Sequence, residues 1–201
     1  MNLIVNKELN VTMRSIQQFL LLSLFACLMC WQPVARAGNI DVSYARLESA
    51  EDGYRLAASF SFDLSKELEN VLTSGIPLYF VTEVEITRPR WYWFDEKSVI
   101  SQQSVRISYN VLTRQYRAAI NGSFAQNYKD LDDALSLVRR PSRWLVSDRS
   151  ALSYGATYNV GIRVRLDTNQ LPKPLQFNAL NNSDWRLSSD WKRMTFRADE
   201  K

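Results

Sequence analysis

Apolar and polar residues alternate along most of the chain beyond residue 38, and an alternation with a period of two predicts half-buried β-strands. The longest such run is Tyr54–Leu64, in which every second residue is apolar. Similar runs lie at residues 40–44, 78–86, 105–111, 116–120 and 158–166, and a short closing strand is expected around Met194 and Phe196. The phase breaks at residues 45–47, where we expect a bulge or the end of the first strand.

Two segments change to a helical period. The first follows Ser65, a residue type that caps helix N-termini, and closes at Gly75. The second follows Asp130 and stops at Pro141, with apolar residues recurring at i, i+3, i+4 and i+7: Leu131, Ala134, Leu135 and Val138. Both helices are expected to be short.

Short turn signals join most of the predicted strands, which favours antiparallel pairing. These signals are Glu51-Asp52-Gly53, Leu112-Thr113-Arg114 and Asn121-Gly122. Residues 141–155 have no clear pattern, and Pro172 and Pro174 predict an extended chain between Leu171 and Leu175. The expected fold is therefore mainly β: one antiparallel sandwich over residues 38–201, immunoglobulin-like or open-barrel-like, with two short helices.

The first 37 residues have the pattern of a secretory signal peptide. Arg14 precedes an apolar run at residues 19–31, and Ala35-Arg36-Ala37 has the small-x-small pattern of a cleavage site. We expect export to the periplasm with cleavage before Gly38; the alternative is an uncleaved anchor at Leu20–Trp31 in the inner membrane, with the domain facing the periplasm. Translation from Met13 instead of Met1 would leave the same leader.

Residue types that are missing narrow the possible chemistry. The chain has no histidine, and its two cysteines, Cys27 and Cys30, lie in the leader. The mature chain therefore lacks a thiol nucleophile, a sulfur metal ligand and the usual general base near neutral pH. A formal net charge of +4 for the whole chain is too small to favour nucleic acid.

Carboxylates offer the remaining catalytic hypothesis. Glu83 and Asp95 could form the acid pair of a glycan hydrolase, although solvated positions explain them better. Asp130, Asp132 and Asp133 could hold a hard cation, but helix N-capping explains the same residues. We therefore predict no catalytic, metal-binding or cofactor-binding residue and no cofactor.

Residues 88–97 contain four consecutive aromatics between arginines. Trp91 and Trp93 fall on alternate positions and are expected to pack inward. The outward half of this stretch is a candidate surface for a protein partner or a lipid boundary, and it consists of Arg88, Arg90, Tyr92 and Phe94.

Four more arginines project from the polar faces of three predicted strands: Arg106, Arg117, Arg163 and Arg165. If the strands are neighbours, these side chains form one cationic face that suits an acidic protein, anionic lipid or glycan phosphate. Pairing of the arginines with Glu and Asp across strands is the alternative that we favour.

The segment Ser108-Tyr109-Asn110-Val111-Leu112-Thr113-Arg114-Gln115-Tyr116-Arg117, with Trp91–Glu96 upstream and Asp184-Trp185 and Trp191 downstream, resembles the proteobacterial family known as domain of unknown function 4390. We take Leu112, Thr113, Arg114, Gln115, Tyr116, Trp185 and Trp191 as its structural signature. The turn at Leu112–Arg114 would fix the hairpin register, and we expect Arg114 to be a buried strut that bonds loop carbonyls. The resemblance implies an exported envelope protein of Gram-negative bacteria, often encoded near a sensor histidine kinase, and it supplies no activity, cofactor or catalytic residue.

These observations favour a non-enzymatic interaction or sensory-accessory module of the cell envelope. The expected partner is an envelope protein, with a sensor kinase suggested by the family context and an anionic lipid or glycan as the other ligand classes. The alternatives are a membrane-anchored structural factor of the envelope and a carboxylate-dependent glycan hydrolase.

Overall fold

A computed structural model describes residues 40–89 and 96–198, all within the compact unit Ala37–Lys201. The predicted leader, the two start positions and the stretch from Arg90 to Asp95 lie outside the described residues. In the described part no helix is both long and apolar enough to cross a membrane.

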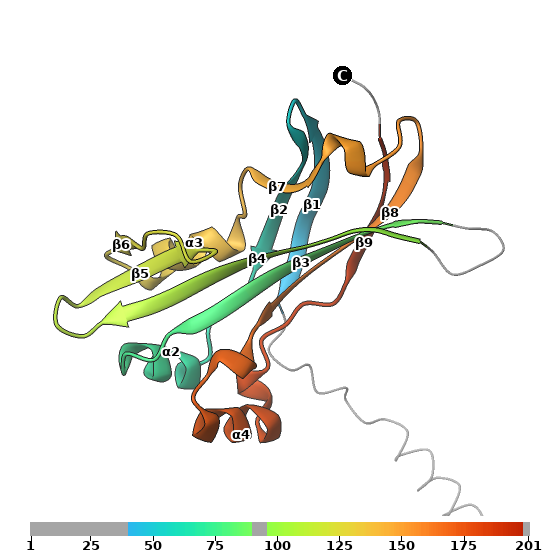
Figure 1. The fold of residues 1–201 in the computed structure, drawn as a ribbon. Helices are drawn as coiled ribbons and strands as arrows, with labels where there is room; N and C mark the ends of the chain where they lie inside the picture. Colours follow the sequence, from blue (N-terminus) through green and yellow to red (C-terminus); the bar gives the residue numbers. More distant parts are fainter. Residues whose placement is uncertain (1–39, 90–95, 199–201) are drawn as a thin grey trace, which may run out of the picture. The chain divides into compact units, whose positions relative to one another are not determined.

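The strands form two antiparallel sheets (Figure 1). The smaller sheet has the order β1-β2-β7, with β1 at Asp41–Ala50, β2 at Gly53–Ser61 and β7 at Trp144–Asp148. The larger sheet has the order β6-β5-β4-β3-β8-β9. Its strands are β3 (Leu78–Arg88), β4 (Glu96–Asn110), β5 (Gln115–Ile120), β6 (Gln126–Tyr128), β8 (Thr157–Leu166) and β9 (Lys192–Arg197). The predicted class, a mainly antiparallel β-sandwich, is confirmed, and the described strands close no barrel.

The hydrophobic core lies on one side of the larger sheet, which we call its inner face. Phe80, Val84, Ile107 and Ile162 point into this core and are fully buried, as the alternation predicts. β1 and β2 cross this sheet in Figure 1. An aromatic pair, Tyr54 of β2 and Phe196 of β9, joins the two sheets. The ring centroids lie 5.5 Å apart for Tyr54 and Phe196.

Two helices cover the inner face near β4 and β5. α2 (Lys66–Thr73) begins at Ser65, whose Oγ accepts a hydrogen bond from the Leu68 backbone N–H. α3 (Leu131–Arg139) buries Leu135 in the same core, and Arg139 at its C-terminal end donates to the Phe62 carbonyl. Both predicted helices are confirmed, although the Asp130 side chain makes no cap hydrogen bond.

Three local expectations are corrected by the structure. β1 continues to Ala50, and its irregularity falls between Val42 and Tyr44 rather than at residues 45–47. The patternless segment 141–155 contains β7, which pairs with β2.

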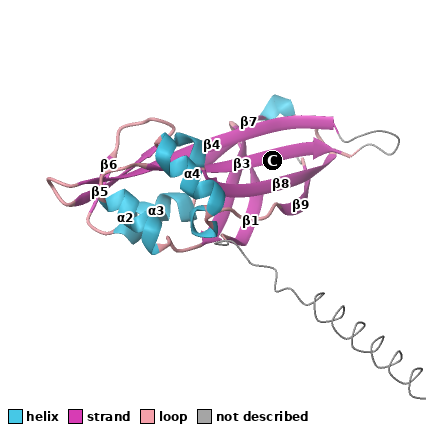
Figure 2. Cartoon of the chain, turned by 90° about the horizontal axis from the view of Figure 1, so that it is seen from below, coloured by secondary structure: helices cyan, strands magenta, loops and turns pink. Residues whose placement is uncertain are grey.

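The segment around the two prolines is a helix instead of an extended chain. α4 (Lys173–Asn181) has Pro174 in its first turn, where no backbone N–H has an intrahelical partner, so proline is tolerated there. The described residues therefore contain three α-helices rather than two. In Figure 2, α2, α3 and α4 lie toward one end of the larger sheet, while β3, β4 and β8 run on together toward its other end.

Candidate functional site on the outer face of the larger sheet

The strand register places all four predicted arginines on one side of the larger sheet, opposite the core, which we call its outer face. Arg106 stands opposite Tyr79, Arg165 opposite Val81 and Arg163 opposite Glu83. Arg117 stands opposite Ser108, two residues from Arg106 on β4. Directly opposed residues and alternate residues along a strand share a face. The condition for a common arginine face is met in part: β4 and β5 are neighbours, whereas β3 lies between β4 and β8.

Glu83 lies at the centre of this face, and only 9% of its side chain is exposed. Its Oε2 accepts from Arg163 Nε at 2.9 Å, and its Oε1 accepts from Arg165 Nε at 3.1 Å. Arg165 also pairs with Asp167 Oδ1 at 3.3 Å, and Gln102 Nε2 reaches Glu83 Oε1 at 3.4 Å. Cross-strand pairing, the alternative that we favoured, is therefore confirmed for two of the four arginines.

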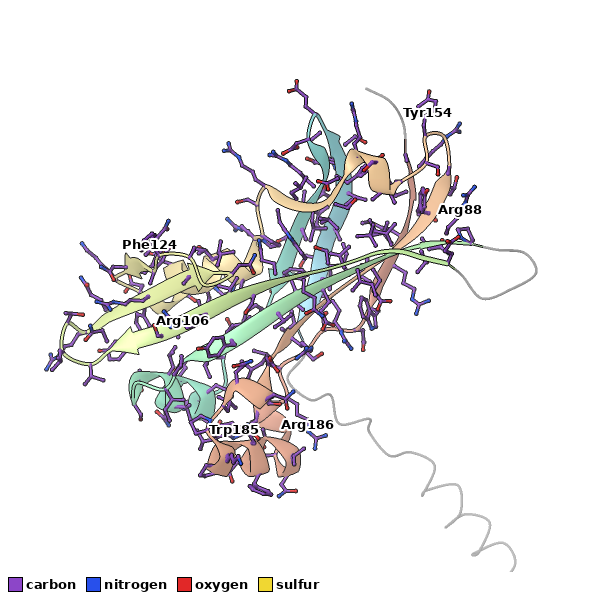
Figure 3. The ribbon with its side chains drawn as sticks, viewed as in Figure 1. Arg88, Arg106, Phe124, Tyr154, Trp185 and Arg186 are labelled. Atoms are coloured by element: carbon purple, nitrogen blue, oxygen red, sulfur yellow. The ribbon has the colours of Figure 1, made fainter. Side chains whose placement is uncertain are left out.

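The other two arginines are not neutralised by a described carboxylate. Arg106 is exposed on β4 (Figure 3). Arg117 donates from Nε to the Asn127 amide oxygen at 3.0 Å, a contact that leaves its charge in place. The outer face thus has a paired half on β3 and β8 and a cationic half on β4 and β5.

Trp191 lies on the paired half and is held by its neighbours. The Arg163 guanidinium carbon lies 4.6 Å from the centroid of the Trp191 ring, a cation–π geometry. The ring also lies against Gly161 of β8, where a Cβ atom would come 3.2 Å from Trp191 Cε3. Gly161 therefore allows the indole to approach the strand closely.

A hollow of about 510 Å³ lies next to Trp191, over β3, β8 and β9. Besides Trp191 and Gly161, its lining includes Glu85, Arg193 and Thr195. The sheet forms its floor because Gly161 has no side chain there.

The tip of the β4–β5 hairpin lies at the end of the two strands that carry the cationic half, and it has a defined conformation. The Asn110 side-chain oxygen accepts from the backbone N–H groups of Leu112 (3.0 Å) and Thr113 (3.2 Å). Arg114 takes a left-handed backbone with φ of 52°, which closes the turn. The tip leaves 57% of Val111 and 95% of Leu112 exposed.

The expectation that Arg114 is a buried strut is wrong. Its side chain is exposed, and the turn is stabilised by Asn110, a residue type whose amide commonly bonds the backbone two residues on. On the inner side of the hairpin, the Tyr109 and Tyr116 ring centroids are 4.9 Å apart. Burial raises the pKa of Tyr116, and the nearby Tyr109 hydroxyl acts in the same direction.

The described carboxylates form no group that could hold a metal ion, and the suggested acid pair lies only partly within the described residues. Asp132 is paired with Arg139 at 3.0 Å, and the described residues contain no group of three acidic ligands close enough to hold a metal ion. Glu83 has both oxygens engaged by arginines, and Asp95, its suggested catalytic partner, lies outside the described residues.

Comparison with protein families tests the family resemblance that the hairpin segment at residues 108–117 suggested. A family model described as domain of unknown function (DUF4390) matches residues 37–195, which include both sheets except the last two residues of β9. The chain belongs to the DUF4390 family. No curated protein and no solved structure gives a significant match.

The other predicted residues of this DUF4390 domain are the rest of the signature and the candidate surface at residues 88–94. Trp185 is buried beside α4 (Figure 3). Gln115 and Tyr116 are the first two residues of β5. Arg88 is exposed at the end of β3, opposite Glu96, whereas Arg90, Tyr92 and Phe94 lie outside the described residues.

The hollow was not predicted from the sequence. One signal could have revealed it: Gly161 interrupts the most regular strand of the chain, and an isolated glycine inside a strand indicates a close approach by another group. Nothing in the sequence placed Glu85 and Arg193 at the same hollow, because their pairing with β8 depends on strand order.

Proposed function

We propose that this DUF4390 protein is a non-enzymatic interaction module of the cell envelope that docks a partner protein through the tip of its β4–β5 hairpin. One observation carries the proposal: a turn fixed by Asn110 leaves Val111 and Leu112 exposed, in the same turn as the exposed Arg114.

The tip is exposed and already ordered, as a preformed binding surface would be. Leucine exposed almost completely to water contributes little to folding, while its burial against a partner removes apolar surface from solvent. Because Asn110 already fixes the turn, docking would lose little conformational entropy. An exposed apolar residue set in a rigid turn therefore favours an intermolecular role.

The arginines of the β4–β5 hairpin specify the partner further. Arg106 and Arg117 lie on the same face of the hairpin strands, and Arg114 is exposed in the turn. Arginine is enriched at the energetic centres of protein interfaces and pairs bidentately with carboxylates. The complementary surface would thus present an apolar pocket with acidic residues around it.

Binding rather than reaction fits the paired half of the face as well. The carboxylate of Glu83 is held between two guanidinium groups, so it is not placed to transfer a proton to a substrate. The chain also lacks histidine, the most frequent general base of enzymes.

The envelope is the proposed compartment because of the signal-like leader, and the family context favours a sensor kinase as the partner. A sensory-accessory role would place the hairpin against the extracytoplasmic part of such a kinase. The alternative compartment, an uncleaved inner-membrane anchor, is distinguished by sequencing the N-terminus of the mature protein: a chain that starts at Gly38 has lost the anchor.

Photo-crosslinking in living cells tests the docking proposal. A photoreactive amino acid at position 112 should yield one defined adduct with an envelope protein, identified by mass spectrometry. The same amino acid at Tyr154, exposed in the loop before β8, is the control (Figure 3). Arg114→Glu should remove the adduct at unchanged protein level. Equal adducts from positions 112 and 154, or an adduct that Arg114→Glu leaves intact, would overturn the proposal.

A further inference from the structure

The hollow beside Trp191 has a fixed aromatic wall. The Arg163 guanidinium covers the indole ring at 4.6 Å, and Arg163 is itself held by Glu83. Gly161 lets the ring lie against β8 without a clash. A ligand that contacts this ring meets a surface already in place, so that little side-chain entropy is lost on binding.

The polar groups around the hollow are of mixed type. Glu85 supplies a carboxylate that accepts hydrogen bonds, and Arg193 supplies a guanidinium that only donates them. Asn159 adds an amide, and Thr87 and Thr195 add hydroxyls at the rim. The hollow of about 510 Å³ lies within the size range of small-ligand sites, roughly 300–1,000 Å³.

This mixture disfavours three ligand classes. A simple anion would lie beside the Glu85 carboxylate, and a simple cation would lie beside the Arg193 guanidinium. A purely apolar ligand would bury several polar groups without partners, which is unfavourable. A neutral ligand with many hydroxyl groups avoids all three conflicts.

A sugar ring has that chemistry. Its hydroxyl rim both donates and accepts, and a planar guanidinium such as that of Arg193 can bond two neighbouring hydroxyls. The C–H groups of its flat face carry slight positive charge and are attracted to the negative face of an indole. We infer that the hollow formed by Gly161, Trp191, Glu85 and Arg193 binds a neutral pyranose unit of a glycan chain.

This inference goes beyond the proposed function, because it assigns a ligand class to the paired half of the face, away from the docking hairpin. A module with both sites could present a glycan signal to the partner held by its hairpin. The two proposals fail separately, since glycan binding is measured on purified protein and partner docking is measured by crosslinking in cells.

The test is a titration of the purified full chain, labelled with ¹⁵N, with three neutral probes: N-acetylglucosamine trisaccharide, maltotriose and cellotriose. The resonance of the Trp191 indole N–H, assigned with Trp191→Phe, should shift saturably with at least one trisaccharide in the millimolar range. The corresponding monosaccharide should bind more weakly, because the inferred ligand is one unit of a glycan chain. Equal binding of the monosaccharide would contradict the inferred chain.

Substitutions of exposed residues at the rim of the hollow test binding without disturbing the core of the protein. Arg193→Ala and Thr195→Arg change exposed residues of β9 and should weaken binding at least about tenfold, a change of about 1.4 kcal/mol. Arg140→Ala, an exposed arginine at the end of α3, is the matched control and should leave the affinity unchanged. The inference is overturned if no trisaccharide shifts the resonance or if the rim variants bind like the parent.

Discussion

The two faces of the larger sheet are held together by different kinds of interaction. On the inner face, Phe80 and Val84 of β3 are fully buried among apolar side chains. On the outer face of the same strand, Glu83 is almost as well buried, but its neighbours are Arg163 and Arg165. One strand thus packs by apolar contact on one side and by charge-assisted hydrogen bonds on the other.

The difference has consequences for how each face responds to change. Apolar packing is non-directional, so the inner face should tolerate substitutions that conserve volume. The outer cluster is directional, and removal of one partner leaves the others partly desolvated without a counter-charge. The inner face therefore fixes the fold, while the outer face places a few polar and aromatic groups in exact positions relative to one another.

The largest effect is expected for a truncation on the inner face. Phe80→Ala removes a fully buried ring that lies 5.6 Å from the Phe62 ring, and should destabilise the protein by about 3–5 kcal/mol. Urea unfolding followed by circular dichroism measures this loss. A decrease below about 1 kcal/mol would show that this face is not the principal core.

A smaller effect is expected for the central carboxylate of the outer face. Glu83→Gln removes the charge shared by Arg163 and Arg165, whose side chains are 32% and 30% exposed. Removing a partner from a fully buried pair costs about 3–5 kcal/mol, and this partial exposure lowers the expected loss to about 1–3 kcal/mol.

The control for this substitution is Glu51→Gln in the exposed β1–β2 turn, which should change stability by less than about 0.5 kcal/mol. A double-mutant cycle with Arg165→Met separates the pairwise contribution from the loss of a single charge. Equal effects of the two glutamate substitutions would remove the distinction between the faces.

The sequence predicts these two faces unequally well. The inner face follows from alternation alone, because a strand with apolar residues at every second position has one side to bury. The polar side of each strand is equally readable, but the partners of Glu83 depend on β8 pairing with β3 across a gap of about eighty residues, which local pattern does not reveal.

The errors have local physical causes. Pro174 seemed to exclude a helix because proline breaks helix interiors, but it lies in the first turn of α4. Arg114 was expected to stabilise its turn, although the Asn110 amide does so through two backbone bonds. In the first case the position of the proline within its helix decided the outcome, and in the second a neighbouring residue, Asn110, has the side chain that bonds the turn.

A substitution at the hairpin tip measures how much the β4–β5 turn contributes to the stability of the fold. Asn110→Ala removes two hydrogen bonds to the backbone of the turn and should destabilise the protein by about 1 kcal/mol. Thermal unfolding of this variant, with Asn70→Ala on the exposed side of α2 as a control, measures the effect. A loss as large as that of Phe80→Ala would mean that the tip belongs to the folding core.

The smallest effect on stability is expected for Leu112→Ser. Like Phe80→Ala, this substitution removes an apolar side chain, but 95% of Leu112 is exposed and contributes almost no burial to the folded state. The free energy of unfolding should change by less than about 0.5 kcal/mol. The partner adduct should nevertheless be lost when the photoreactive amino acid is placed at Val111 in the Leu112→Ser background. If unfolding shifts by more than about 1 kcal/mol, Leu112 is a structural residue, and the contrast between a folding face and a binding face does not extend to the hairpin.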